Sequence, residues 1–202
     1  MERFLFQFNK WPFVIRFSVV TAYIALVNSY ALFIVYPSLK TTDVIAIAIS
    51  LALYVLLTLP LLVYVAKKFQ PRPQLGVVGV GFLAMVSATL LQYFISHPSL
   101  PMLIVHMVFY LFAGVIEETL WRGKLWQLVS ERVKNQLSVT AIVTVHFVIL
   151  HIPFALLYKQ VPIIFIGQLV ALGITLGLLR LVTKKITIPS FAHAIVNMVV
   201  YT

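Results

Sequence analysis

Two adjacent glutamates, Glu117 and Glu118, lie at the end of an apolar run that reads HMVFYLFAGVIEETLWRG. An ionisable side chain within an apolar membrane segment is costly and by default marks function. Glu118 and Arg122 are four residues apart, so on a helix they can form an ion pair. Glu117 points about 100° away from that pair, which leaves its carboxylate available for other chemistry. The alternative interpretation is a charge cluster at a helix end.

Histidines provide the second component of a site. His146 and His151 are five residues apart, about 140° around a helix, so they cannot both face one cavity. His193 and Asn197 are four residues apart and can present two hydrogen-bond donors from one helix face. The remaining histidines, His97 and His106, are assigned structural roles.

Other kinds of catalytic site are excluded by residue type. The chain has no cysteine, and its single aspartate, Asp43, lies at the edge of an apolar segment, so neither a cysteine nucleophile nor an aspartyl dyad is available. The sequence also has no H-E-x-x-H, G-x-S-x-G or phosphate-loop motif. Glutamate, histidine and an amide remain, and these groups suit water activation and oxyanion stabilisation.

These residues must be positioned by membrane helices. The chain is 62% hydrophobic and 10% charged, with a mean hydropathy of +1.05, and apolar runs of about 20 residues recur along it. We therefore predict an all-α transmembrane helical bundle that forms a single membrane domain over residues 1–202. About seven spans are expected, at 12–36, 43–66, 76–96, 101–121, 138–157, 161–181 and 186–201.

The basic residues indicate an orientation. They form short clusters between the apolar runs, which argues against a nucleic-acid partner and points to the lipid bilayer. With a cytoplasmic N-terminus, only Lys40 and Lys159 of the fifteen Lys and Arg residues fall outside. Residues 124–134, KLWQLVSERVK, are predicted to form a short interfacial helix on the cytoplasmic surface.

The polar residues also match three motifs of a known family. The sequence resembles the CPBP family of intramembrane proteases, which includes the type II CAAX prenyl endopeptidases and the bacterial Abi proteins. The family motifs E-E-x-x-x-R, F-x-x-x-H and H-x-x-x-N occur in order, each on its own predicted span. They are Glu117-Glu118-Thr-Leu-Trp-Arg122, Phe147-Val-Ile-Leu-His151 and His193-Ala-Ile-Val-Asn197. The match covers residues 101–201, which we predict to be the catalytic core.

The resemblance implies a role for each motif residue. Glu117 would activate a water molecule that His151 helps to hold, and His193 with Asn197 would stabilise the oxyanion. Glu118, Arg122 and Phe147 would support the site. Glu117, His151 and His193 could together bind zinc. We favour a mechanism without a metal cofactor, because Glu117 would otherwise have to be ligand and base together.

The resulting prediction is an integral-membrane endopeptidase that cleaves a membrane-associated peptide or protein near the cytoplasmic face. The short chain is typical of bacterial members, so a bacterial cell membrane is expected. Two alternatives remain: a non-enzymatic binding or immunity protein of the same fold, and a small transporter that uses the buried charges as a relay. A count along straight helices places Glu117 and His193 about 7–10 Å deep and His151 about 20 Å deep, so it does not align them.

Overall fold

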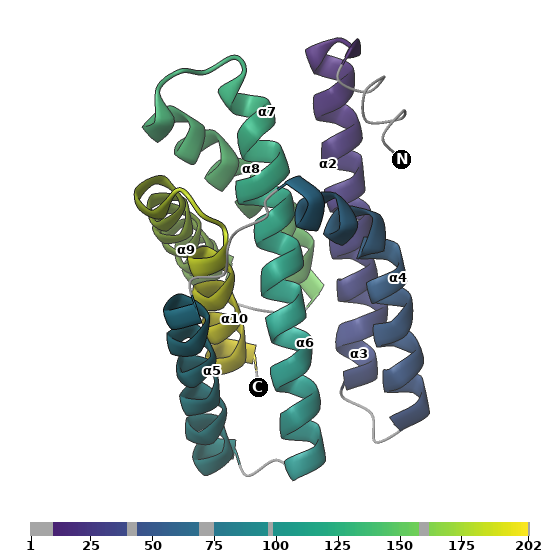
Figure 1. Cartoon of the computed structure of the whole chain (residues 1–202). Coiled ribbons are helices and arrows are strands. Elements are labelled where there is room, and N and C mark those ends of the chain that lie inside the picture. Colours follow the sequence, from purple (N-terminus) through teal and green to yellow (C-terminus); the bar gives the residue numbers. More distant parts are fainter. Residues whose placement is uncertain (1–9, 40–43, 69–74, 97–98, 158–161, 202) are drawn as a thin grey trace.

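The computed structural model describes residues 10–39, 44–68, 75–96, 99–157 and 162–201, and all regular structure within these ranges is helical (Figure 1). The prediction of an all-α bundle is confirmed. The helical segments coincide with the predicted spans: α2 (Phe13–Tyr30) continues through the π-helix η1 (Ala31–Val35) into α3 (Tyr36–Leu39), followed by α4 (Val44–Lys68), α5 (Leu75–Ser96), α6 (Leu100–Glu118), η2 (Thr119–Leu125), α7 (Trp126–Ser130), α8 (Gln136–Leu157), α9 (Pro162–Thr183) and α10 (Thr187–Tyr201).

Four of the described helical segments have the length and hydropathy needed to cross a membrane: Phe13–Val35, Leu100–Ser130, Gln136–Phe154 and Ile163–Thr183. Shorter apolar stretches occur within three further helices: Ile45–Leu59 in α4, Gly79–Leu91 in α5 and Thr187–Val199 in α10. Many large apolar side chains on these helices face outwards and are exposed, as expected of a surface in contact with lipid. The chain is therefore an integral membrane protein, and the count of seven spans stays a prediction.

One predicted element is absent as a separate unit. The sequence predicts an interfacial helix over residues 124–134, but α6, η2 and α7 instead form one helical run from Leu100 to Ser130 (Figure 1). Leu125, Leu128 and Val129 are buried in this run. The prediction of a separate helix was wrong because the apolar residues of this segment pack against the other helices. This packing stabilises the continuation of the helix from α6 to Ser130.

Glycines allow close helix packing where the site forms. A Cβ on Gly114 of α6 would come within 2.7 Å of the Ser190 carbonyl oxygen of α10. A Cβ on Gly173 of α9 would come within 2.7 Å of the Thr144 side chain of α8. The backbones of α6 and α10, and of α8 and α9, therefore approach more closely than any larger residue would allow.

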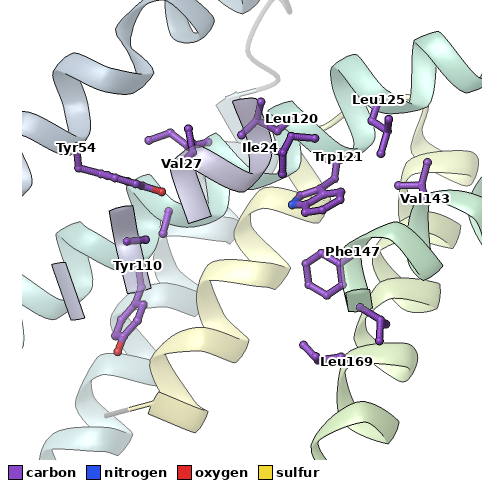
Figure 2. Packing of buried hydrophobic residues seen from close by; sticks show 14 of the residues in the cluster. Ile24, Val27, Tyr54, Tyr110, Leu120, Trp121, Leu125, Val143, Phe147 and Leu169 are labelled. Atoms are coloured by element: carbon purple, nitrogen blue, oxygen red, sulfur yellow. The ribbon is translucent and has the colours of Figure 1, made fainter. Parts of the chain in front are cut away.

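Buried aromatic residues fill the space between the helices. Trp121 and Phe147 are both fully buried, and Figure 2 shows them side by side within a cluster that also includes Ile24 and Leu120. The two rings meet edge to face, with centroids 5.4 Å apart. This contact fixes η2, which contains Trp121, against α8.

An ion pair joins α2 to the α7–α8 connection at one end of the bundle. Arg16, near the start of α2, contacts Glu131, directly after α7, with 2.5 Å between Nη2 and Oε2. The N-terminal end of α2 and the α7–α8 connection therefore lie at the same end of the molecule, as the predicted topology requires. Which side of the membrane this end faces stays a prediction. Several predicted positions lie outside the described residues: Lys40, Asp43, His97 and Lys159.

Candidate active site

The end of α6 carries a buried ion pair. Arg122 Nη1 donates a hydrogen bond to Glu118 Oε1 at 2.8 Å, and both side chains are fully buried. Arg122 Nη2 also donates to the Gly173 carbonyl oxygen of α9 at 3.0 Å, and the guanidinium lies 5.0 Å from the centroid of the Phe147 ring. The pair predicted from the i, i+4 spacing thus also joins α6 to α8 and α9. η2, which contains Arg122, is a π-helix, a feature frequent at functional sites.

Glu118 has a second partner on a distant helix. Its Oε1 lies 2.9 Å from Nδ1 of His193, on α10. A carboxylate can only accept, so Nδ1 of His193 is the donor and carries a proton. Glu118 therefore fixes the orientation of the His193 ring, so that its other nitrogen, Nε2, faces Glu117.

Glu117 faces the two motif histidines. Its Oε2 lies 3.6 Å from Nε2 of His193 and 3.7 Å from Nε2 of His151, while the residue as a whole is only 7% exposed. The His151 ring is fixed by its own helix, because Nδ1 lies 2.7 Å from the Phe147 carbonyl oxygen. Both imidazoles thus direct Nε2 toward the same carboxylate oxygen.

These residues line one cavity of about 160 Å³. Glu117 contributes from α6, Phe147 and His151 from α8, and His193 and Asn197 from α10. All the predicted catalytic residues are therefore brought together, although a straight-helix count does not align them. The other lining residues are mostly apolar and come from α2, η1, α8 and α9: Ala25, Asn28, Ser29, Ala31, Leu150, Pro153, Phe154, Leu169 and Leu172.

The other described histidines lie elsewhere. Nε2 of His146 is 2.9 Å from Thr21 Oγ1 of α2, and its ring packs edge to face on Trp121 with centroids 5.1 Å apart. His106 packs on Tyr110 within α6. Neither lines the cavity, so the helical geometry that separates His146 from His151 holds in the structure.

Glu117, His151 and His193 are also the candidate zinc ligands. Within the described residues, no group of three or more His, Cys, Asp or Glu side chains is arranged so that it could hold a metal ion. These three side chains therefore do not fit a preformed zinc site as they are placed here. The predicted mechanism without a metal and its zinc-dependent alternative both stay predictions.

A family model matches the half of the chain that builds most of this cavity. The model of the type II CAAX prenyl endopeptidase Rce1-like family matches residues 98–199. The chain belongs to this family. At the level of the Rce1-like family it is a CAAX-type intramembrane protease, with a membrane-associated protein or peptide as substrate. The comparisons with curated proteins and with solved structures each returned no match.

One part of the cavity wall lies outside the residues matched by the Rce1-like family and was not predicted from the sequence. Asn28 and Ser29, on α2, line the cavity but belong to none of the three motifs. The signal available in the sequence was Asn28, an amide side chain within the first apolar segment, because a polar group is costly there unless it has a structural or functional role.

Proposed function

We propose that this chain is an endopeptidase in which Glu117 activates a water molecule to hydrolyse a peptide bond of a membrane-associated peptide or protein. The observation that carries the proposal is the position of Glu117 on the cavity wall, with Oε2 3.6–3.7 Å from two imidazole Nε2 atoms. The neighbouring acid, Glu118, is already engaged by Arg122 and His193. Glu117 is thus the carboxylate left to act as a base.

His151 and Glu117 bind the attacking water. Because Nδ1 of His151 donates to the Phe147 carbonyl oxygen, the neutral ring presents a lone pair at Nε2. A water molecule between this Nε2 and Glu117 Oε2 donates one hydrogen bond to each. Glu117 then takes one proton as the oxygen attacks the carbonyl carbon of the substrate.

His193 and Asn197 bind the oxyanion of the tetrahedral intermediate. The His193 ring lies between two carboxylates, Glu118 at Nδ1 and Glu117 at Nε2, and because a carboxylate can only accept, the proposed mechanism places a proton on both ring nitrogens. Its Nε2–H and the Asn197 amide donate hydrogen bonds to the oxyanion. Glu118 and Arg122 act through His193 as positioning residues.

Collapse of the intermediate completes the reaction. Glu117 passes its proton to the leaving nitrogen as the C–N bond breaks, so the products are a carboxylic acid and an amine. Water supplies the oxygen of the new acid, and Glu117 returns to its ionised form. No oxidant or other co-reactant is needed.

The proposal is tested with purified protein in proteoliposomes and two quenched fluorescent peptides. One ends in farnesylated Cys-Val-Ile-Met, because the family description names CAAX prenyl substrates, and the other is the same peptide without the farnesyl group. Cleavage by the wild type and its loss in Glu117→Gln support the proposal. The matched control is Glu131→Gln, which changes a glutamate outside the cavity and should cleave at the wild-type rate.

The outcomes separate the alternatives. Cleavage of the farnesylated peptide alone identifies a prenyl-dependent enzyme, and cleavage of both peptides identifies a broader intramembrane protease. A folded Glu117→Gln variant that cleaves at the wild-type rate contradicts the role of Glu117 as base. Binding of the peptides without any cleavage by the wild type would favour the non-enzymatic alternative.

A further inference from the structure

One wall of the cavity is built by residues outside the family motifs. α2 contributes Ala25, Asn28 and Ser29, and η1 contributes Ala31. The other two residues that this segment contributes to the lining are alanines. Two consecutive polar residues that line the cavity therefore call for a physical explanation.

Asn28 is one of two cavity residues with an unsatisfied buried atom. Among the described residues that line the cavity, only Glu117 and Asn28 have a buried side-chain nitrogen or oxygen without a hydrogen-bond partner. For Asn28 the atom is the amide nitrogen Nδ2. The proposed mechanism explains why Glu117 is kept free, but it gives no role to Asn28.

Attachment of α2 to the other helices does not explain why a polar amide lies at position 28. The neighbouring polar residues of α2 have partners on other helices: Thr21 with His146 of α8, and Tyr23 and Tyr30 with backbone carbonyls of α4. These bonds already attach α2 to the bundle. An amide nitrogen that is buried without a partner costs free energy, so it is expected where a ligand satisfies it.

The ligand that matches this amide is a peptide backbone. A substrate chain that enters a membrane cavity brings N–H and C=O groups that have lost their water, and the apolar residues of the cavity cannot pair with them. An asparagine side chain offers one donor group and one acceptor, the same pair that a peptide unit presents. One Asn can therefore satisfy both groups of an extended segment.

We propose that Asn28 binds the backbone of the substrate next to the scissile bond, with its amide N–H₂ donating to a peptide carbonyl and its amide oxygen accepting from a peptide N–H. This inference rests on the proposed function of the same cavity. Because these contacts are to the backbone, they do not discriminate between substrate side chains. They exist before the transition state as well as in it, so their loss raises KM and leaves kcat nearly unchanged.

The test uses Asn28→Leu, which keeps the size of the side chain and removes its hydrogen bonding. The matched control is Thr21→Val, a similar change on the same helix that removes a bond outside the cavity. Both are placed in the Glu117→Gln background, so that affinity is measured without turnover. The probe is the farnesylated Cys-Val-Ile-Met peptide, together with a set in which one backbone amide at a time is replaced by an ester.

The expected result is that Asn28→Leu weakens binding of the amide peptide about fivefold to tenfold, as for the loss of two weak hydrogen bonds, while Thr21→Val does not. At one position, the ester should weaken binding to the protein that keeps Asn28 but cause no further loss in the Asn28→Leu variant. Such non-additivity is the signature of two groups in contact. Asn28→Leu should also unfold at no lower temperature than its parent, since it removes an unpaired amide.

Three results would overturn the inference: unchanged affinity in Asn28→Leu, additive effects at every ester position, or no binding of the probe to either protein. Cleavage by the protein with an intact Glu117 is measured in parallel with the same peptide. Coupling between Asn28 and one amide without any cleavage would contradict the proposed function alone. Cleavage without coupling would contradict the role of Asn28 alone.

Discussion

The N-terminal helices and the helices that carry the motifs satisfy their polar side chains differently. In α2 and α4, neutral hydroxyls bond to carbonyl oxygens, as Thr58 does to Tyr54 of its own helix and Tyr23 does to Leu57 of α4. In α6, η2, α9 and α10, charged groups share several partners. Arg122 contacts Glu118 and the Gly173 carbonyl oxygen, and its own carbonyl accepts from Arg180.

The difference shows which bonds hold the site in place. A hydroxyl that bonds to a carbonyl can be replaced by an apolar group with little loss, because such bonds within membranes contribute about 0.6 kcal/mol on average. A buried charge cannot lose one partner without leaving the other uncompensated. The buried charged network therefore fixes how α6, α8, α9 and α10 sit against each other. Inside the bundle, α2 and α4 are attached by packing and neutral hydrogen bonds, and the one ion pair described for α2, Arg16–Glu131, lies at the exposed end of the helix.

The largest effect is expected from breaking the charged network. Arg122→Ala leaves Glu118 buried without its cation, which should destabilise the fold by about 3–5 kcal/mol and lower the amount of folded protein. The measurement is the apparent unfolding temperature in detergent. Glu118→Ala should behave similarly, and the double variant should recover part of the loss. Equal stability of the wild type and all three variants would exclude a structural ion pair.

The two kinds of histidine should differ in their effect on catalysis. His193→Ala removes an oxyanion donor, so kcat should fall by about 10²–10³-fold, and His151→Ala should likewise lose cleavage. His146→Ala removes a histidine that bonds to Thr21 outside the cavity, so kcat should stay close to the wild-type value. The measurement is kcat for the quenched peptides with folded protein. An equal fall in kcat for His146→Ala and His193→Ala would show that the catalytic residues are not those that line the cavity.

A smaller effect is expected from separating α6 and α10. Gly114→Ala places a methyl group against the Ser190 carbonyl oxygen and should cost about 1–3 kcal/mol as these helices move apart. Gly123→Ala is the matched control, since the nearest atom to its Cβ is the Glu118 carbonyl oxygen at 3.9 Å. Unfolding temperatures and kcat are compared for both. Tolerance of Gly114→Ala with full activity would contradict close helix packing as the feature that joins His193 to Glu118.

The smallest effect is expected in the N-terminal helices. Tyr23→Phe removes one hydrogen bond to the Leu57 carbonyl oxygen and should cost about 0.6 kcal/mol, with no change in kcat. The same unfolding assay checks this. A loss of stability as large as that of Arg122→Ala would show that the N-terminal helices depend on single hydrogen bonds as strongly as the motif helices depend on their charged network.

Much of the fold and part of the site were determined by the sequence alone. Runs of apolar residues long enough for a membrane gave the helical segments, because burial of backbone polar groups in lipid requires helices. The Glu118–Arg122 pair and the separation of His146 from His151 followed from positions on a single helix, where the angle between residues is fixed. The end of α6 could not be placed, since hydropathy does not reveal that residues up to Ser130 pack against the bundle.

Only the tertiary structure decided how the site is assembled. At 1.5 Å per residue, Glu117 and His151 each lie about 20 Å from the helix ends at Ser130 and Gln136, whereas His193 lies about 9 Å from the start of α10. They meet because the α9–α10 connection lies deeper in the bundle than the α7–α8 connection (Figure 1). The contact of Glu118 with His193 further requires the close approach at Gly114. Hydropathy fixes the depth of a span only to within several residues, while a hydrogen bond between helices depends on their relative height and rotation, which packing alone sets.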